Sequence, residues 1–293
     1  GRKGQSMRVC VRGKKRGQWF DFNPGTGGDL LDLWREAHGI SFLDALREAK
    51  AFLGIEDDAR AAFNKPEKEY KLPPKPKAKR IGGESQVMAY LHGRGISDEA
   101  IKAYKIGEID SLPQHLGNKP GPWIVFPFFD GDKLVGVKYL SLERNEKGKK
   151  IIVAEGDCRP TLFGWNVVGN KRQLVVTEGE LDAMTLYDYG IPAVSVPNGG
   201  GTGRKQQWID HDWDKLQQFD DIVLCMDNDD GGRSGAGEIS DRVGEHRCLF
   251  VELPHKDANE CKRQGVGREE VVACFDNATS RDPDELRSAS EFC

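Results

Sequence analysis

Residues 174–182 read LVVTEGELD, an apolar run that gives way to an acidic one. Val and Thr fit a pleated, half-buried surface, so residues 174–177 favour a buried β-strand. Glu178 follows this strand directly, and Asp182 stands four residues later. That spacing places both carboxylates on one side if the chain turns into a helix there. The stretch therefore predicts a strand that delivers carboxylates at its carboxyl end.

Three further apolar runs repeat this pattern along the chain. They lie at residues 193–197, 222–226 and 249–253, and helical stretches separate them. Strands that alternate with helices are typical of a parallel sheet with helices on its faces. The predicted fold class is therefore α/β for this part of the chain. In open parallel sheets, ligands bind at the carboxyl ends of the strands.

Acidic residues also follow two of these other strands. Residues 226–232 read MDNDDGG, and residues 255–260 read HKDANE. If the strand continues through Asp229, the alternation of side chains places Asp227 and Asp229 on one side. Clustered carboxylates repel one another unless a cation lies between them, and hard oxygen ligands favour magnesium or manganese over zinc. Such ions are typical of phosphoryl transfer.

The acidic residues also have two simpler interpretations. A single acidic strand end is common on solvated surfaces. Asp227 and Asp229, with Gly232 and Glu238, also resemble a calcium-binding EF-hand loop. That loop needs an oxygen ligand where Gly231 stands and a preceding helix rather than an apolar strand. Three acidic clusters in register with three strands favour a metal site of the phosphoryl-transfer kind.

The same motifs carry a family resemblance. EGELD at residues 178–182, NGGG at 198–201, DND at 227–229 and KDANE at 256–260 resemble a TOPRIM domain. This fold occurs in primases, topoisomerases and some nucleases. The motifs are most similar to those of phage primase–helicases and their Twinkle-type relatives, and the resemblance covers residues 85–275. It implies a four-stranded parallel TOPRIM sheet with flanking helices, preceded by a mixed α+β subdomain.

The resemblance also implies roles for individual residues. Metal ligands would be Glu178, Asp227, Asp229 and Asp257, with Asp230 as a weaker candidate. Catalysis would involve Glu178, Asp182, Asp227 and Asp229. Nucleotide or template would be bound by Lys138, Arg144, Lys149, Lys150, Asn198, Gly199 and Lys256. Among the basic residues, Lys138 matches the family position best, and Arg144, Lys149 and Lys150 are looser matches. A solvated hairpin explains residues 147–150 almost equally well.

We expect five segments along the chain. Residues 1–56 would form a small N-terminal domain, and residues 57–80 a linker rich in Pro and Lys. Residues 81–170 would form the N-terminal subdomain of an RNA polymerase core, and residues 171–275 the TOPRIM domain. Residues 276–293 would begin a linker toward a helicase domain.

The first segment departs from the family pattern. GGDLLDL at residues 27–33 resembles the tail of a primase zinc-binding domain, but no cysteine stands in the WFDFNPG stretch before it. The resemblance therefore predicts that the zinc site is lost, so no zinc is expected. Trp19 and Phe20 are expected to pack in a core. Alternatively, they could stack on single-stranded DNA beside the basic residues at 12–16.

Charge and composition limit the classes of partner. Residues 1–80 hold 18 Lys and Arg against 11 Asp and Glu, a net of +7, which leaves −11 for the rest because the whole chain carries −4. A basic front and an acidic back fit a nucleic-acid binder with a metal site. The seven cysteines include no Cys-x-x-Cys pair, which favours reduced thiols and a cytoplasmic location in a bacterial or phage-infected cell. No apolar run reaches membrane-spanning length, so no membrane partner is expected.

The resulting prediction is a DNA primase that makes short RNA primers on single-stranded DNA from ribonucleoside triphosphates. Magnesium or manganese would be its cofactor, and a replicative helicase, expected as a C-terminal domain of the same polypeptide, would be its partner. The sequence contains no phosphate-binding loop of the GxxxxGK[ST] type, so no motor activity is expected from this segment. Two alternatives remain: a TOPRIM nuclease or topoisomerase fragment, and a non-catalytic module that binds single-stranded DNA or associates with a helicase.

Overall fold

The computed structural model describes residues 6–12, 16–23, 25–53, 69–81, 83, 85–169 and 171–280. Residues 57–68 of the predicted linker at 57–80 and residues 281–293 of the predicted segment at 276–293 lie outside these residues. The chain divides into two compact units. One consists of Gly1–Glu69, Gly244–His246 and Arg281–Cys293, and the other of Tyr70–Val243 and Arg247–Ser280.

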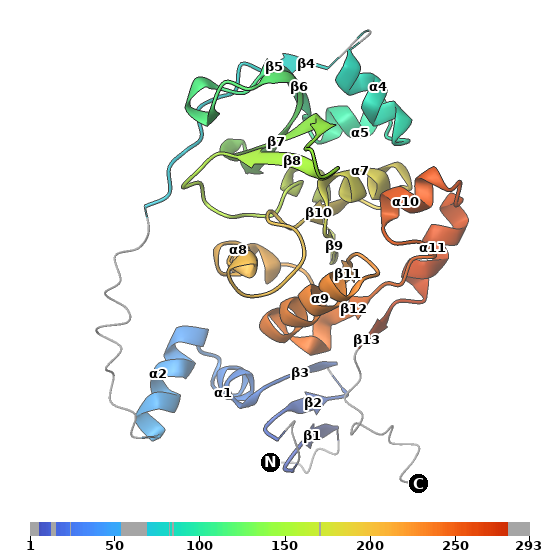
Figure 1. Cartoon of the computed structure of the whole chain (residues 1–293). Helices are drawn as coiled ribbons and strands as arrows, with labels where there is room; N and C mark the ends of the chain where they lie inside the picture. Colours follow the sequence, from blue (N-terminus) through green and yellow to red (C-terminus); the bar gives the residue numbers. More distant parts are fainter. Residues whose placement is uncertain are drawn as a thin grey trace. The chain divides into compact units, whose positions relative to one another are not determined.

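The first unit contains a small antiparallel sheet followed by two helices (Figure 1). The strands are β1 (Met7–Val9), β2 (Trp19–Asp21) and β3 (Thr26–Gly28), and the helices are α1 (Leu30–His38) and α2 (Phe42–Phe52). Asp29 caps α1 by accepting hydrogen bonds from two backbone N–H groups of the first turn. Trp19 is 6% exposed, which confirms that it packs in the interior of the unit.

An antiparallel sheet opens the second unit. Its strands pair in sequence order: β4 (Lys79–Arg80), β5 (Gly107–Ser111), β6 (Pro120–Asp130), β7 (Lys133–Arg144) and β8 (Lys150–Ala154). Hairpin turns connect β6 to β7 and β7 to β8. Two short helices, α4 (Gln86–Gly93) and α5 (Asp98–Ala103), precede β5. Ser85 and Ser97 cap them at their N-termini.

The second sheet of this unit contains the four predicted parallel strands. They are β9 (Gln173–Thr177), β10 (Ala193–Ser195), β11 (Asp221–Cys225) and β12 (Cys248–Phe250). The order across the sheet is β10-β9-β11-β12-β13, and β13 (Thr279–Ser280) is antiparallel to β12. The predicted four-stranded parallel sheet is confirmed, with a two-residue edge strand added that sequence reasoning missed.

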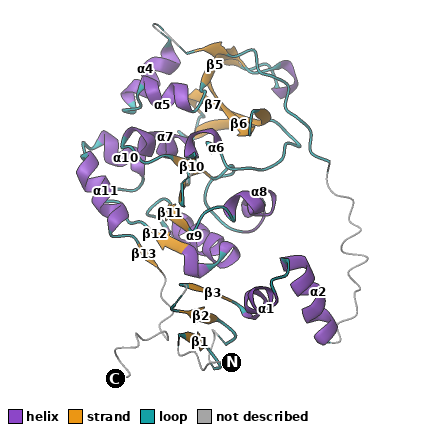
Figure 2. Ribbon diagram, turned by 180° about the vertical axis from the view of Figure 1, so that it is seen from behind, coloured by secondary structure: helices purple, strands orange, loops and turns teal. Residues whose placement is uncertain are grey.

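Helices cover both faces of the parallel sheet (Figures 1 and 2). On one face Val175 and Val223 pack against α7 (Glu180–Asp188), α10 (Ala258–Arg263) and α11 (Arg268–Asp276). On the other, Leu174 and Ile222 pack against α6 (Trp165–Val168), α8 (Trp208–Leu216) and α9 (Asp230–Val243). Successive side chains of a strand point to opposite faces, so a strand buried on both faces is apolar throughout.

The two sheets of this unit share one hydrophobic core. The cluster that contains Val175 and Val223 also contains Ile124 and Phe126 of β6. Buried Tyr104, which ends α5, donates hydrogen bonds to the carbonyl oxygens of Ala183 (3.0 Å) and Ala193 (2.7 Å). The antiparallel sheet is therefore packed directly on the parallel sheet.

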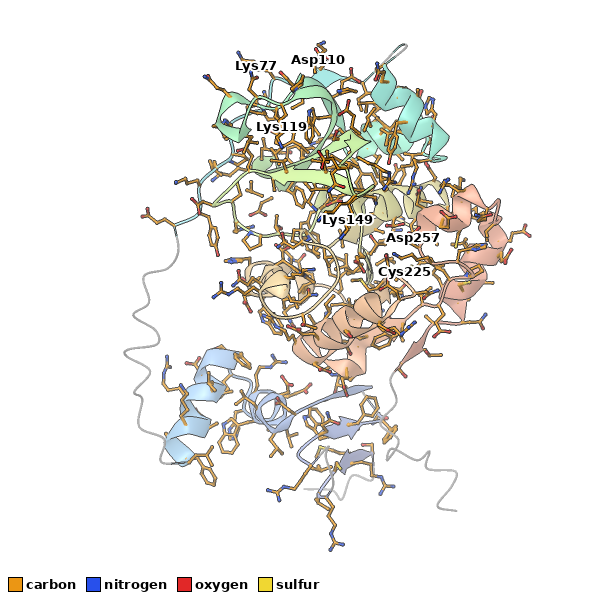
Figure 3. All side chains as sticks on the ribbon, in the orientation of Figure 1. Lys77, Asp110, Lys119, Lys149, Cys225 and Asp257 are labelled. Atoms are coloured by element: carbon orange, nitrogen blue, oxygen red, sulfur yellow. The ribbon has the colours of Figure 1, made fainter. Side chains whose placement is uncertain are left out.

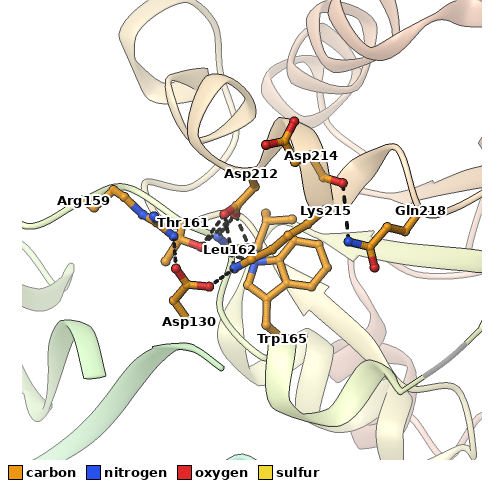
Figure 4. A network of polar contacts seen from close by, with 9 residues as sticks. All are labelled: Asp130, Arg159, Thr161, Leu162, Trp165, Asp212, Asp214, Lys215 and Gln218. Carbon is orange, nitrogen blue, oxygen red and sulfur yellow. Dashed lines mark hydrogen bonds and ion pairs between the residues drawn. The ribbon is translucent and has the colours of Figure 1, made fainter. Parts of the chain in front are cut away.

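A buried polar network forms a second connection within this unit (Figure 4). Asp212 of α8 is fully buried and accepts hydrogen bonds from Thr161 Oγ1 (2.7 Å), Leu162 N (2.8 Å) and Trp165 Nε1 (3.0 Å). The ammonium of Lys215 lies 3.7 Å from Asp212 and 2.7 Å from Asp130, at the end of β6. Each buried polar group here has a partner of opposite charge or a hydrogen-bond donor.

Helices of the described residues are short or amphipathic. None is long and apolar enough to cross a membrane.

Candidate active site

Three acidic loops lie at the carboxyl edge of the parallel sheet. They follow β9, β11 and β12, which are adjacent and parallel. One carboxylate oxygen from each of Asp182, Asp227 and Asp257 lies within 4.8 Å of the others. Figure 3 labels Asp257 together with Cys225, the last residue of β11. The structure therefore brings together three of the carboxylates that the sequence predicts for the site.

Glu178 follows the last residue of β9 and is half-buried. Its carboxylate accepts a hydrogen bond from the backbone N–H of Gly200, and a Cβ atom at that glycine would lie 2.3 Å from Glu178 Oε2. Oε2 is buried and has no hydrogen-bond partner among the described residues. Burial, followed by the negative charge of Asp227, raises the pKa of Glu178 above its ordinary value of 4.5. The carboxylate thus has a buried oxygen without a partner among the described residues and an acid beside it, a setting that suits a cation.

Asp182 lies in the first turn of α7 and is held from α10. Its Oδ1 accepts a hydrogen bond from the backbone N–H of Asn259 (2.9 Å). Asn259 is 1% exposed, and its side-chain amide donates to Thr185 Oγ1 (2.8 Å) and to the carbonyl of Arg94 (2.9 Å). Burial, followed by the charge of Asp257, raises the pKa of Asp182 well above 3.8. Asn259 therefore fixes α10 against α7, and this contact brings the carboxylates of Asp182 and Asp257 together.

Asp227 and Asp229 lie in a loop rather than on a strand. β11 ends at Cys225, so the condition that the strand continues through Asp229 is not met, and strand alternation does not place the two carboxylates. A tight turn fixes them instead: the backbone N–H of Gly232 donates to Asp229 Oδ1 (3.0 Å). A Cβ atom at Gly232 would lie 2.1 Å from the backbone oxygen of Asp227, so only glycine fits there. The strand ends early because the backbone turns into α9.

Lys256 lies between these two carboxylates. Its Nζ is 3.1 Å from Asp227 Oδ2 and 3.2 Å from Asp229 Oδ2. The two hydrogen bonds raise the pKa of Lys256, and the pKa of Asp229 is lowered by the N–H of Gly232 and then by Lys256. The pKa of Asp227 is nevertheless raised, because burial outweighs the lysine. The sequence places Lys256 at nucleotide or template, whereas the structure places it on two predicted metal ligands.

The donor atoms at this edge fit a divalent metal ion. They are carboxylate oxygens, and one of them, Glu178 Oε2, is buried without a partner among the described residues. The thiol of Cys225 is close by, but burial and the charge of Asp182 raise its pKa well above 9.0. A thiol that stays protonated is a poor metal ligand, whereas carboxylates suit hard cations.

Residues 175–262 match a family model described as Toprim-like. These residues form a Toprim-like domain. Over 153 residues the chain is 30% identical to the DNA helicase/primase of Enterobacteria phage T3, covering 51% of this chain and 26% of that protein. It is 23% identical over 291 residues to the DNA primase of Lactococcus lactis, covering 82% and 44%. The solved structure of the DnaG catalytic core aligns with a TM-score of 0.53 at 23% identity, covering 66% of this chain and 73% of that one.

These comparisons confirm the resemblance to TOPRIM-containing primases and the predicted fold. The chain spans about a quarter to under a half of the length of these two curated relatives.

Two of the predicted basic residues lie next to the acids of the Toprim-like domain. Lys138 of β7 forms an ion pair with Glu180, the first residue of α7, and both side chains are 12% exposed. Lys150, the first residue of β8, is exposed, and its positive charge acts to lower the pKa of Asp182. The antiparallel sheet thus brings positive charge next to two acids of α7, Glu180 and Asp182.

Two more of the predicted basic residues lie where β7 ends and in the turn that leads to β8. Arg144 is exposed and donates a hydrogen bond to the carbonyl oxygen of Gly148 (2.9 Å) within that turn. Lys149 is also exposed (Figure 3). These two side chains belong to a solvated hairpin.

The glycine-rich loop after β10 faces Glu178. Gly199 has a φ of 69°, and a Cβ atom there would lie 3.9 Å from Glu178 Oε1. Asn198 is exposed at the start of this loop. Asp230, the weaker candidate, is exposed and forms an ion pair with Arg233 (2.8 Å) rather than joining the Asp182 cluster.

Sequence reasoning missed four supporting residues of the Toprim-like domain. They are Glu180, Gly200, Asn228 and Asn259. All four stand inside the quoted motifs, so the motifs were the available signal. What the motifs do not indicate is that these residues hold the predicted site residues in place rather than acting on a ligand.

Proposed function

We propose that this chain is the primase part of a primase–helicase, which synthesises short RNA primers on single-stranded DNA by metal-dependent nucleotidyl transfer. The observation that carries the proposal is the convergence of Glu178, Asp182, Asp227 and Asp257 at one sheet edge, beside a sheet that carries Lys138. An acidic edge facing basic side chains suits a reaction in which cations and lysines together neutralise phosphates.

Magnesium or manganese would be held by Glu178, Asp227, Asp229 and Asp257, with Asp182 in support. These ions would stabilise the negative charge that develops on the phosphates and lower the pKa of the attacking hydroxyl. We expect magnesium rather than zinc, because the donors are carboxylates.

Glu178 is the proposed general base. Its carboxylate would accept the proton of the primer 3′-hydroxyl while the hydroxyl oxygen bonds to the α-phosphorus of the incoming nucleotide. The bond from the α-phosphorus to the bridging oxygen breaks, and pyrophosphate leaves with the electron pair. The raised pKa of Glu178 suits this role, since a base works best when its pKa approaches the working pH.

The basic residues would bind the polyanionic substrates. Lys138 and Lys150 of the antiparallel sheet lie beside acids of α7 and would contact the triphosphate of the incoming ribonucleotide. Arg144, at the end of β7, and Lys149, in the turn that follows, are exposed and would bind the template backbone, where each contact adds salt-sensitive affinity. Asn198 and Gly199 would line the site beside Glu178.

Partners and domain organisation complete the proposal. A replicative helicase would lie C-terminal to this segment in the same polypeptide, in a cytoplasmic setting. Residues 1–56 would form a degenerate zinc-binding-like domain without zinc, residues 81–170 and 171–275 the two parts of the polymerase core, and residues 57–80 and 276–293 the linkers. The hydrophobic core shared by Ile124 and Val175 supports treating 81–275 as one catalytic body.

Primer synthesis tests the proposal directly. The assay combines mixed-sequence single-stranded DNA, labelled ribonucleotides and Mg²⁺ or Mn²⁺, with the wild type, Glu178→Gln and Asp230→Asn. Asp230→Asn removes one negative charge from an exposed acid outside the cluster and serves as the matched control. We expect short RNA from the wild type and the control, and a loss of about 10²–10⁴-fold in Glu178→Gln.

Three results would contradict the proposal. Equal synthesis by Glu178→Gln would exclude its role as the base. DNA binding without any RNA product, with both metals and with the helicase part restored, would support the non-catalytic DNA-binding module instead. Cleavage of the DNA in place of synthesis would support the nuclease.

A further inference from the structure

Lys256 occupies the position between Asp227 and Asp229. Its Nζ lies within 3.2 Å of one oxygen of each. The two carboxylates differ in exposure, since Asp227 is 15% and Asp229 is 48% exposed. A half-buried carboxylate with other acids around it requires a nearby positive charge. In the protein without metal, Lys256 supplies that charge.

The backbone at Lys256 is fixed while its side chain is not. The N–H of Asn228 donates to the carbonyl oxygen of Lys256 (2.7 Å). The side-chain amide of Asn228 donates to the carbonyl oxygens of Leu253 (2.7 Å) and His255 (3.0 Å). The loop after β12 is therefore hydrogen-bonded to the loop after β11. The Lys256 side chain is 56% exposed, so it can rotate away without disturbing either loop.

We propose that Lys256 is an internal cation that neutralises Asp227 and Asp229 in the metal-free protein and that a divalent ion must displace it. The inference rests on the metal site of the proposed function. The ammonium and a divalent ion compete for the same oxygens, Asp227 Oδ2 and Asp229 Oδ2. Binding of the ion releases the Lys256 side chain toward solvent, where it becomes available to a phosphate.

Competition makes a specific prediction about affinity. Removing the ammonium removes the competitor, so Lys256→Met should bind Mg²⁺ or Mn²⁺ about tenfold more tightly than the wild type. The same substitution leaves the two carboxylates uncompensated in EDTA, so its metal-free melting temperature should fall by about 2–4 °C.

Titration calorimetry of the whole chain with MgCl₂ or MnCl₂ tests the affinity. Lys262→Met is the matched control, because Lys262 lies in α10 over the ring of Tyr189 (4.6 Å) and its removal changes the net charge equally. We expect Lys256→Met to bind more tightly and Lys262→Met to bind as the wild type does. Equal or weaker ion binding by Lys256→Met than by Lys262→Met overturns the displacement of Lys256.

A second measurement uses the unchanged protein and does not depend on how a variant folds. An amine held in two ion pairs keeps its proton and reacts slowly with acylating reagents. Acylation of Lys256, followed by mass spectrometry, should therefore speed up several-fold when Mg²⁺ is added, while that of Lys262 does not change. An unchanged or slower reaction at Lys256 overturns the proposal. Failure of every variant to bind either ion would overturn it together with the metal site, whereas loss of RNA synthesis alone would leave both binding results standing.

Discussion

Two groups of buried acids lie in the second unit, and they differ in what surrounds them. Asp212 accepts hydrogen bonds from Thr161, Leu162 and Trp165 and lies near one lysine (Figure 4). Asp182 accepts one backbone hydrogen bond and otherwise faces Asp257 and Asp227. A buried carboxylate surrounded by donors stabilises a fold, whereas one surrounded by carboxylates costs stability until a cation arrives.

Burial alone therefore does not separate a structural acid from a functional one. Asp212 is fully buried, and burial is also the first cause that raises the pKa of Asp182. The neighbouring groups decide, because hydrogen-bond donors satisfy a charge and like charges do not. Substitutions of Asp212 and Asp182 should therefore change the free energy of unfolding in opposite directions.

The largest effect should come from Asp212. Asp212→Ala leaves the half-buried Lys215 without one of its partners and three donors without an acceptor. We expect the free energy of unfolding to fall by about 3–5 kcal/mol, as measured by urea unfolding followed by circular dichroism. Asp214→Ala, on the same helix and exposed, should change it by less than about 0.5 kcal/mol. A small effect at Asp212 would mean that the network does not hold α8 in place.

The next effect should have the opposite sign. Asp182→Asn keeps an oxygen that can accept from the N–H of Asn259 but removes the repulsion with Asp257 and Asp227. In EDTA, we expect the free energy of unfolding to rise by about 1–3 kcal/mol, the scale of a screened like-charge contact. Mg²⁺ should then stabilise this variant less than the wild type. Asp241→Asn, which removes an exposed charge from α9, is the control and should change neither value.

The stability of the protein should also depend on pH. The size of this effect should be similar to that of Asp182→Asn or smaller. The folded pKa values of Glu178, Asp182 and Asp227 lie above the ordinary 4.5, 3.8 and 3.8. Above about pH 4 the unfolded chain has released protons that the folded chain still holds, so stability falls as pH rises. In EDTA the urea midpoint should therefore decrease from about pH 5 until these groups have ionised.

The lowered pKa of Asp229 acts only below 3.8 and does not oppose this trend. Saturating Mg²⁺ should abolish the decrease, because the ion favours the charged carboxylates. An equally steep decrease in Asp182→Asn would assign the effect to other groups.

The smallest effect should come from an exposed ion pair at the opposite end of the strands. Arg172 and Asp220 pair there with side-chain exposures of 91% and 54%. Arg172→Ala should change the free energy of unfolding by about 0–1 kcal/mol, and less in high salt. A large change would show that the start of β9 matters more to stability than its acidic end does.

The sequence predicts the parallel sheet well, because its strands are continuous apolar runs with charged ends. The expected strand at 174–177 differs from β9 by one residue. The loop that follows β11 is predicted less well, because turns such as the one at Gly232 depend on close backbone contacts. β13 is missed because two exposed residues carry no pattern.

The acids of the site are predictable, but the position of Lys256 is not. Carboxylates at strand ends gather because parallel strands end at one edge. The partner of a long, flexible lysine is decided by tertiary neighbours, here Asp227 and Asp229 from another loop. Likewise, nothing in the spacing of residues predicts that Lys138 pairs with Glu180 across the two sheets.

The central position of β9 has a consequence for synthesis on the ribosome. β9 lies between β10 and β11, and Gln173–Thr177 pairs with Asp221–Cys225, almost fifty residues later in the chain. The antiparallel sheet before it pairs neighbouring strands and can form as soon as they emerge. At about 5–20 residues per second, roughly 4–16 s separate the synthesis of Glu178 from that of Asp257. During that interval Glu178 and Asp182 remain hydrated and apart from Asp257. Lys256 emerges immediately ahead of Asp257.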